Sequence, residues 1–198
     1  MVKYTLKEKI TKYLIENKDS NHSIMKISQK LKADYKNTSQ ALSKINPKVY
    51  SKIKQGNSYL IDFNPDNNIE TLSVERKRTR DFFSNNLKLK VLRKYIRELN
   101  YPFLIVLVFG SYIRGINTKN SDIDICIILD NKNKSIELNE KLNLLSLNLE
   151  IQEFTSKEFI SMIEKKQNNL GNEIVKNNII LYGIENYYNL ISKWMKKE

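Results

Sequence analysis

The sequence has few of the residues on which several kinds of protein chemistry depend. Its 198 residues include one cysteine, Cys126, and one histidine, His22. A single cysteine cannot form an internal disulfide, and its position in an apolar run predicts a buried, unreactive thiol. One histidine in a polar stretch does not make a metal site. We therefore expect a protein that works without cysteine or histidine chemistry.

Long hydrophobic runs are also absent. No apolar stretch approaches the roughly 20 residues that a membrane-spanning helix needs. The first residues, MVKYTLKEKI, lack the apolar core of a signal peptide. These features predict a cytoplasmic protein with no membrane partner, and the length suits one medium domain or two small ones.

Negative charge is scarce in only one half of the chain. Residues 1–98 contain 22 Lys or Arg against 10 Asp or Glu, whereas residues 99–198 contain 12 of each, so the net charge of +12 comes from the first half. This asymmetry favours a nucleic-acid-binding module joined to a neutral one. A generally basic surface is the alternative.

The first 65 residues show a pattern of three short helices followed by a hairpin. Apolar residues recur at helical spacing up to Ile45, and Ser23 and Asp34 are suited to cap the second and third helices. Strand-like segments then flank Gln55-Gly56-Asn57. The arrangement resembles a winged helix-turn-helix domain over residues 1–65, ending at the polar break that begins with Pro65.

In that resemblance the third helix enters the major groove of DNA, and the hairpin grips the flanking backbone. A small helical module that binds protein, or that only supports its neighbour, is the alternative. Winged-helix DNA binders are often dimers, so a homodimer is also considered. The residues expected to contact nucleic acid are Tyr35, Lys36, Asn37, Ser39, Gln40, Ser43 and Lys44 on the helix, and Lys52 and Lys54 on the wing.

Residues 66–100 are predicted to form a basic helical linker and the first helix of a second domain, which spans residues 101–198. The run ERKRTRDFF is strongly basic. It is either a solvated face or an extension of the nucleic-acid surface. In the second domain, strands are predicted at 103–109, 123–129 and 147–154, and helices at 134–146, 156–166, 169–179 and 184–197. The fold class is therefore α+β.

Two carboxylates, Asp122 and Asp124, lie one residue apart at the start of the second predicted strand. Strand side chains alternate, so both point to the same side. Unpaired, they would repel each other, whereas a hard divalent cation such as Mg²⁺ or Mn²⁺ would bind them together with phosphate oxygens. Glu150 on the next strand supplies a third carboxylate for a two-metal site. Glu153 competes for that role but falls on the other strand face.

A Gly-Ser pair, Gly110-Ser111, ends the first predicted strand. Glycine lets the backbone approach a phosphate closely, and the hydroxyl and N–H groups that follow can hold its oxygens. The segment GSYIRGINTKNSDID resembles the minimal nucleotidyltransferases of the DNA polymerase β superfamily, over about residues 86–182. The resemblance implies a mixed β-sheet packed with helices. It assigns nucleotide binding to Gly110, Ser111, Arg114 and Ser121, and catalysis and metal binding to Asp122, Asp124 and Glu150.

The resemblance implies transfer of a nucleoside monophosphate from an NTP, by default ATP, to a hydroxyl of a protein or RNA acceptor. Winged helices are fused to prokaryotic members of this group, some in toxin–antitoxin systems, so a toxin or antitoxin partner is expected. Arg114 either stabilises phosphate charge or pairs within its loop. The alternative function is a DNA-binding transcriptional regulator with a non-catalytic transferase-like domain, which the Glu150 in place of the usual Asp favours. A scaffold protein without either activity is the third option.

Overall fold

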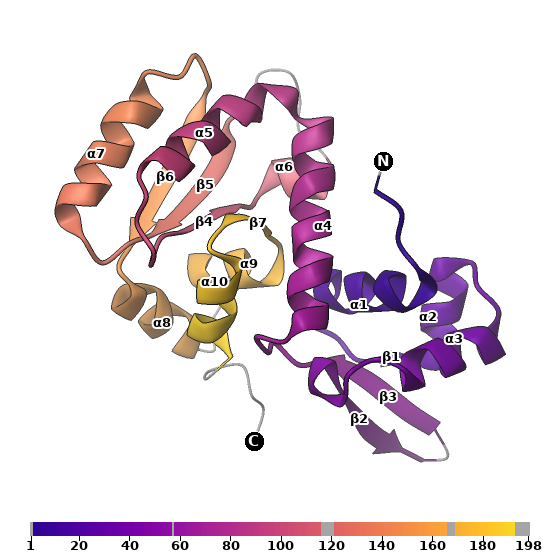
Figure 1. Ribbon diagram of the computed structural model, residues 1–198. Coiled ribbons are helices and arrows are strands. Elements are labelled where there is room, and N and C mark those ends of the chain that lie inside the picture. The colour runs from indigo at the N-terminus through magenta and orange to yellow at the C-terminus, as the bar shows by residue number, and fades with distance from the viewer. Residues whose placement is uncertain (1, 57, 116–120, 166–168, 193–198) are drawn as a thin grey trace.

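The computed structural model describes residues 2–56, 58–115, 121–165 and 169–192. The chain forms an N-terminal part and a C-terminal part, and the long helix α4 stands between them (Figure 1). None of the described helices is long and apolar enough to cross a membrane.

The N-terminal part consists of helices packed against a small antiparallel sheet. Its elements are α1 (Leu6–Glu16), β1 (His22–Ser23), α2 (Ile24–Leu31), α3 (Tyr35–Ser43), the 3₁₀ turn η1 (Pro47–Val49), β2 (Tyr50–Gln55) and β3 (Ser58–Phe63). The strand order is β1-β3-β2. Both predicted helix caps are confirmed, because Ser23 accepts a hydrogen bond from the N–H of Lys26 and Asp34 accepts one from the N–H of Asn37.

Strand β1 was not predicted, and it changes the setting of the single histidine. His22 pairs with Ile61 of β3 and is only 2% exposed. Its ring nitrogens lie 3.1 Å from the hydroxyl of Tyr13 and 3.0 Å from that of Ser20. His22 is therefore a satisfied core residue, although its sequence neighbours are polar.

The expected helical stretch from 70 to 99 is two helices with a corner between them. Helix α4 (Ile69–Asn85) ends at Asn86, whose amide group donates 2.8 Å to the carbonyl of Phe82. The short 3₁₀ turn η2 (Leu87–Leu89) follows, and α5 (Lys90–Glu98) then begins. The corner lets Phe82 of α4 and Leu92 and Ile96 of α5 join one buried cluster.

The C-terminal part is built on a four-stranded mixed sheet. Its strands are β4 (Ile105–Val108), β5 (Ile123–Ile128), β6 (Leu149–Phe154) and β7 (Ile179–Tyr182), in the order β6-β5-β4-β7. Strands β5 and β6 are parallel, while β4 is antiparallel to both of its neighbours. Three strands match the predicted ones. Strand β7 was not predicted; it begins at the end of the stretch 169–179 that was predicted to be helical.

Helices cover both faces of this sheet and give it a three-layer core. Along β5, Ile125 and Ile127 face α5 and α7 (Lys132–Asn143), whereas Cys126 and Ile128 face the side of α8 (Ser156–Glu164), α9 (Leu170–Lys176) and α10 (Ile184–Ile191). The α+β class and the mixed sheet are thus confirmed. Cys126 is fully buried, and burial raises the pKa of its thiol, as expected for an unreactive group.

The basic run of α4 is mostly used to join the two parts of the chain. Arg78 donates a 2.7 Å bond to the fully buried Glu75, which also accepts one from the Tyr188 hydroxyl of α10 at 2.7 Å. A second guanidinium nitrogen of Arg78 donates to the backbone oxygen of Asn178 at 3.0 Å. In the sequence, Tyr188, Ile191 and Trp194 recur at helical spacing, which predicts core packing. Tyr188 and Ile191 are buried, and Trp194 lies outside the described residues.

Candidate functional site

The first component of the site is the bend at the end of β4. Gly110 has φ 71° and ψ −144°, a conformation that side chains disfavour. A Cβ placed on it would lie 1.9 Å from Oδ2 of Asp124. Glycine is therefore needed here because the bend touches a carboxylate of the next strand, and this contact was not foreseen from the sequence. Ser111 follows as the first residue of α6 (Ser111–Arg114), and its side chain is half-buried.

The second component is the start of β5, with Asp124 as its second residue and Asp122 directly before the strand. Asp122 is exposed and Asp124 is half-buried. The backbone oxygen of Asp124 accepts a 3.1 Å bond from the N–H of Phe109, which fixes the strand against the glycine bend. Across the described ranges, no Lys or Arg forms an ion pair within 4.0 Å of either carboxylate.

The third component comes from β6. Glu150 is the in-register partner of Asp124 in the parallel pair, so the two side chains leave the same face of the sheet on strands about 4.8 Å apart. Two residues further on, Gln152 donates a 3.3 Å bond to Glu150. The structure thus brings together the backbone of Gly110 and the side chains of Asp124 and Glu150.

The competing residue, Glu153, is held elsewhere. It leaves the opposite face of β6 and accepts hydrogen bonds from Ser135, at 2.5 Å, and from Asn139, both on α7. Its carboxylate is thereby tied to the helix layer. This arrangement favours Glu150 over Glu153 as the third carboxylate.

Arg114 and Ser121, the remaining residues taken from the motif, lie at the edge of the site. Arg114 lies 3.5 Å from Glu173 of α9, and both side chains are about half exposed. Among the described residues Arg114 pairs with α9, and its role at the phosphates stays a prediction. Ser121 is half-buried and lines a cavity of ≈ 850 Å³.

That cavity contains residues that the sequence analysis did not select. It extends from the corner between α4 and α5 to the start of β5, and its lining includes Lys88, Tyr112 and Asn148. Tyr112 lies within the quoted motif, two residues after Gly110, so its position was available from the sequence. Lys88 and Asn148 come from distant segments that only the fold brings together.

The carboxylates fit a divalent cation only in part. In the described part of the chain, no group of three His, Cys, Asp or Glu side chains lies close enough to hold a metal ion by itself. Mg²⁺, however, usually binds one or two carboxylates and completes its shell with waters and substrate phosphates. A pair of unpaired carboxylates beside a glycine bend suits that mode of binding. It does not suit a metal site built entirely from protein groups.

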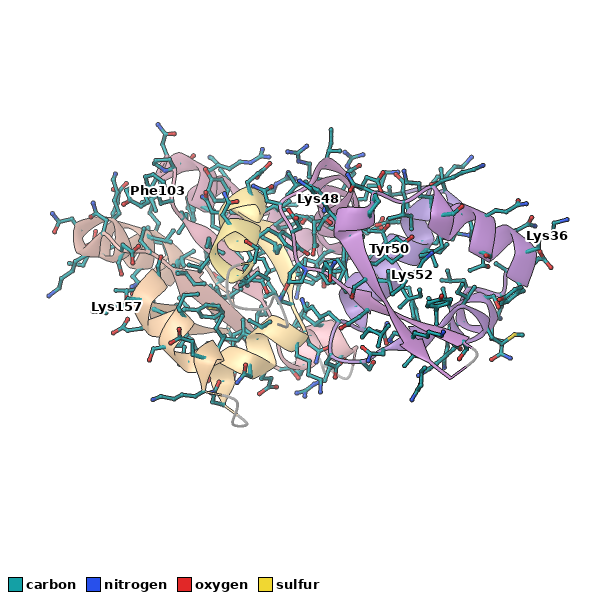
Figure 2. All side chains as sticks on the ribbon, turned by 90° about the horizontal axis from the view of Figure 1, so that it is seen from below. Lys36, Lys48, Tyr50, Lys52, Phe103 and Lys157 are labelled. Carbon is teal, nitrogen blue, oxygen red and sulfur yellow. The ribbon has the colours of Figure 1, made fainter. Side chains whose placement is uncertain are left out.

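The predicted nucleic-acid residues of the N-terminal part lie on its surface. Those on and just after α3 are exposed except Ser39, which is half-buried, and Lys52 and Lys54 of β2 are exposed. Lys36 projects from the outer end of this part, far from Lys157 and Phe103 at the opposite end of the molecule (Figure 2). The polar face of α3 is therefore free to meet a partner.

The comparison with protein families agrees with the geometry. Residues 90–187 match the family described as polymerase beta, nucleotidyltransferase. Enzymes of this family generally use divalent metal ions and an NTP. No curated protein and no solved structure matches the chain. From α5 through β7 to the start of α10, the chain therefore forms a nucleotidyltransferase domain of the polymerase β type.

Proposed function

We propose that this protein transfers a nucleoside monophosphate, AMP by default, from an NTP to a hydroxyl group of an acceptor and releases pyrophosphate. The observation that carries the proposal is the junction of Gly110, Asp124 and Glu150. The glycine bend there contacts Asp124, the in-register partner of Glu150, and no Lys or Arg of the described residues forms an ion pair with either carboxylate. Protein and RNA are the acceptor classes considered for this site.

Each group has a defined task in this proposal. The N–H groups that follow Gly110 and the hydroxyl of Ser111 hold phosphate oxygens of the nucleotide. Asp122 and Asp124 hold the divalent cation, Mg²⁺ or Mn²⁺, which when bound neutralises phosphate charge and acidifies the attacking hydroxyl. Glu150 orients that hydroxyl or accepts its proton. Arg114 reaches the phosphates only by leaving Glu173.

The N-terminal part is proposed to be a winged helix-turn-helix domain, residues 1–65, followed by a linker and first transferase helix, 66–100, and the transferase domain, 101–198. Three helices and an antiparallel sheet, with a polar α3 exposed, support this assignment. The domain would bind DNA or RNA through α3 and the wing. By analogy with related fusions, a toxin or antitoxin is the protein partner we would test first.

A direct test uses purified full-length protein with labelled NTPs, Mg²⁺ and cell extract. We expect label to move to a macromolecule in the wild type and not in Asp122→Ala. Glu140→Ala, which removes an exposed carboxylate of α7, is the matched control and should transfer normally. Equal labelling by the wild type and Asp122→Ala would refute the assignment of the site.

The second candidate function is a DNA-binding regulator with an inactive transferase-like domain. Its support is the lack of a close three-carboxylate group in the described residues, together with the exposed polar face of α3. If this function is correct, duplex DNA binds and no NTP or extract supports transfer. Loss of DNA binding in Lys36→Gln with transfer retained would favour the enzyme.

A further inference from the structure

A groove between α4 and α5 carries an excess of positive charge. Its volume is ≈ 550 Å³, and five cationic side chains line it against a single carboxylate, Glu98. Three of the five are arginines, Arg80 of α4 and Arg93 and Arg97 of α5. The neighbouring cations of α4, Arg76, Lys77 and Arg78, each have an acidic partner, whereas Arg80 in the groove has none among the described residues.

The arginines of the groove are close enough to affect one another. Partial burial, together with the charges of Arg97 and Arg80, lowers the pKa of Arg93. The Arg93 guanidinium lies 5.1 Å from the centre of the Phe83 ring, which fixes it in place. In the part of the chain that the structure describes, no carboxylate lies within 4.0 Å of Arg80, Arg93 or Arg97. The one pair in the groove, Lys94 with Glu98 at 3.7 Å, is largely exposed and contributes little.

The shape of the charged surface suits a polyanion better than a single anion. On α5, Lys90, Arg93, Lys94 and Arg97 recur at positions i, i+3, i+4 and i+7 and so share one side of the helix. From Lys90 to Arg97 they cover about 10 Å along the axis, which is the length of about three phosphates in one strand of a helical nucleic acid. Arginine also matches phosphate geometry through paired N–H groups.

The lining argues against a protein or a membrane as the partner. Its only aromatic or aliphatic residue is Phe83, which is 3% exposed and lies beneath Arg93. Protein interfaces need an apolar core, and membrane-binding helices need an apolar face. A phosphodiester chain needs only the cations.

The groove is adjacent in the chain to a cavity at the start of β5. Helix α5 begins directly after η2, and η2 lines the ≈ 850 Å³ cavity that reaches Ser121 and Ile123. These two residues flank Asp122. Lys88 of η2 lines the same cavity and adds a cation to it. Figure 1 shows α5 leaving the end of α4 that lies nearest to α6.

We propose that the groove between α4 and α5 binds the phosphodiester backbone of the nucleic acid whose hydroxyl accepts the nucleotide. The role as acceptor site rests on the proposed transferase function, but backbone binding does not. The groove is separate from α3 and the wing. The protein would therefore contact nucleic acid at two places, one for recruitment and one for delivery to Asp122 and Asp124.

The test measures binding without catalysis. Full-length protein is titrated into fluorescein-labelled single-stranded RNA, single-stranded DNA and duplex DNA in EDTA, without NTP, and anisotropy is followed from 50 to 300 mM salt. The background variant Lys36→Gln/Lys52→Gln/Lys54→Gln removes the expected contacts of the N-terminal part. The groove variant adds Arg80→Gln/Arg93→Gln/Arg97→Gln to this background. The control variant removes the same number of charges elsewhere, at exposed cations of α7 and the α8 region, and adds Lys132→Gln/Lys157→Gln/Lys165→Gln.

We expect the groove variant to bind at least one of the strands about tenfold more weakly or worse, and to lower the slope of log K against log salt by about 2. The control should change affinity less than about twofold. Arg80→Lys/Arg93→Lys/Arg97→Lys should restore the salt slope, which separates charge from misfolding. Equal losses in the groove and control variants would overturn the proposal, as would tighter binding of an acidic peptide or of anionic vesicles than of any strand.

The proposed transferase function is tested separately on the same proteins. Asp124→Asn should bind the strands as the wild type does and transfer nothing to them. If the groove binds the strands but the wild type transfers no nucleotide to any of them, the groove is not an acceptor site, although it is still a nucleic-acid-binding surface. If transfer to RNA or DNA is normal in the groove variant, the acceptor role is wrong even though the transferase function is correct.

Discussion

Helices α4 and α5 follow each other in the chain and are both rich in lysine and arginine, yet they use these charges differently. On α4, Arg76 pairs with Glu185, Lys77 with Glu8 and Arg78 with Glu75. On α5, Arg93 and Arg97 have no carboxylate partner within 4.0 Å among the described residues. Arg76, Lys77 and Arg78 of α4 hold the two parts of the protein together, whereas Arg80 of α4 and the arginines of α5 face an open groove.

The same division applies to the carboxylates. Glu75 is fully buried and bonded to Arg78 and Tyr188, whereas Asp124 and Glu150 share one face of the sheet and have no ion pair with any described Lys or Arg. Paired charges are expected to stabilise the fold, because removing one partner leaves the other buried and unsatisfied. Unpaired charges are expected to be kept for a ligand, since on their own they repel one another. Substitutions of paired and of unpaired charges therefore test whether the first stabilise the fold and the second bind a ligand.

The largest effect is expected from an unpaired carboxylate. Asp124→Asn should reduce nucleotide transfer about 1,000-fold, equivalent to about 4 kcal/mol, because it removes the charge that holds the cation. The denaturation midpoint should stay the same or rise, since repulsion with Glu150 and Asp122 is relieved. Single-turnover transfer and urea unfolding measure the two quantities. Strong destabilisation with little change in the transfer rate would mean that Asp124 stabilises the fold and does not hold a ligand.

Breaking the paired group should have the opposite signature. Arg78→Met leaves Glu75 buried with only the Tyr188 hydroxyl bonded to it, and we expect the free energy of unfolding to fall by about 3 kcal/mol. The exposed Arg80→Met, two residues along the same helix, should change it by less than about 0.5 kcal/mol. Urea unfolding of both variants gives the comparison. Equal stabilities would mean that the pairing of α4 is not what joins the two parts.

Much of the fold could be predicted from the sequence, and the features that were not predicted share one cause, their dependence on residues distant in the chain. The caps at Ser23 and Asp34 and three of the four strands of the transferase sheet follow from local spacing. The shared side of Asp122 and Asp124 stays a prediction, because Asp122 lies just outside β5. Strand β7 was missed because a short apolar run beside a helical pattern carries no period of its own. The partners of the α4 cations lie 69 to 109 residues away for Lys77 and Arg76, so local sequence could not separate a solvated face from an interface.

The contact between the glycine bend and Asp124 also depended on the fold. The sequence predicts that Gly110 is needed for a close approach, and the strand pairing identifies Asp124 as the group approached. Likewise, the preference for Glu150 over Glu153 as the predicted third carboxylate rests on the hydrogen bonds that α7 makes to Glu153. Residue spacing predicts on which side of a strand a side chain lies. It does not predict which helix or loop covers that side.

Two glycines with positive φ allow the contact at Asp124 to be isolated. Gly110→Ala places a methyl group 1.9 Å from the Asp124 carboxylate and should lower transfer about 100-fold by displacing it. Gly115→Ala, at φ 68° with nothing within 4 Å of the added carbon, should lose stability through backbone strain but little activity. Transfer rates and melting temperatures of the two variants decide the matter. A rate loss of equal size in both would assign the effect to strain alone.

The smallest effect is expected at Lys18, a buried cation near Glu75 and Arg78. Lys18 has no ion pair within 4.0 Å among the described residues. Burial lowers the pKa of its ammonium to about 8, against the attraction of Glu75, Asp19 and Glu16. Between about pH 8 and 9.5 the unfolded chain then binds more protons than the folded one, so this residue makes the free energy of unfolding rise with pH. The window ends there because tyrosines begin to titrate in the unfolded chain.

Lys18→Met should flatten that rise and stabilise the protein by about 1 kcal/mol at pH 7, since an apolar side chain of similar length replaces a desolvated charge. Lys9→Met, at an exposed position of α1, should leave the pH profile unchanged. Urea unfolding at half-unit steps across the window provides the measurement. A pH profile for Lys18→Met that runs parallel to that of the wild type would contradict this prediction. It would mean that the attraction of Glu75, Asp19 and Glu16 offsets the burial of Lys18, so that Lys18 belongs with the paired charges that stabilise the fold.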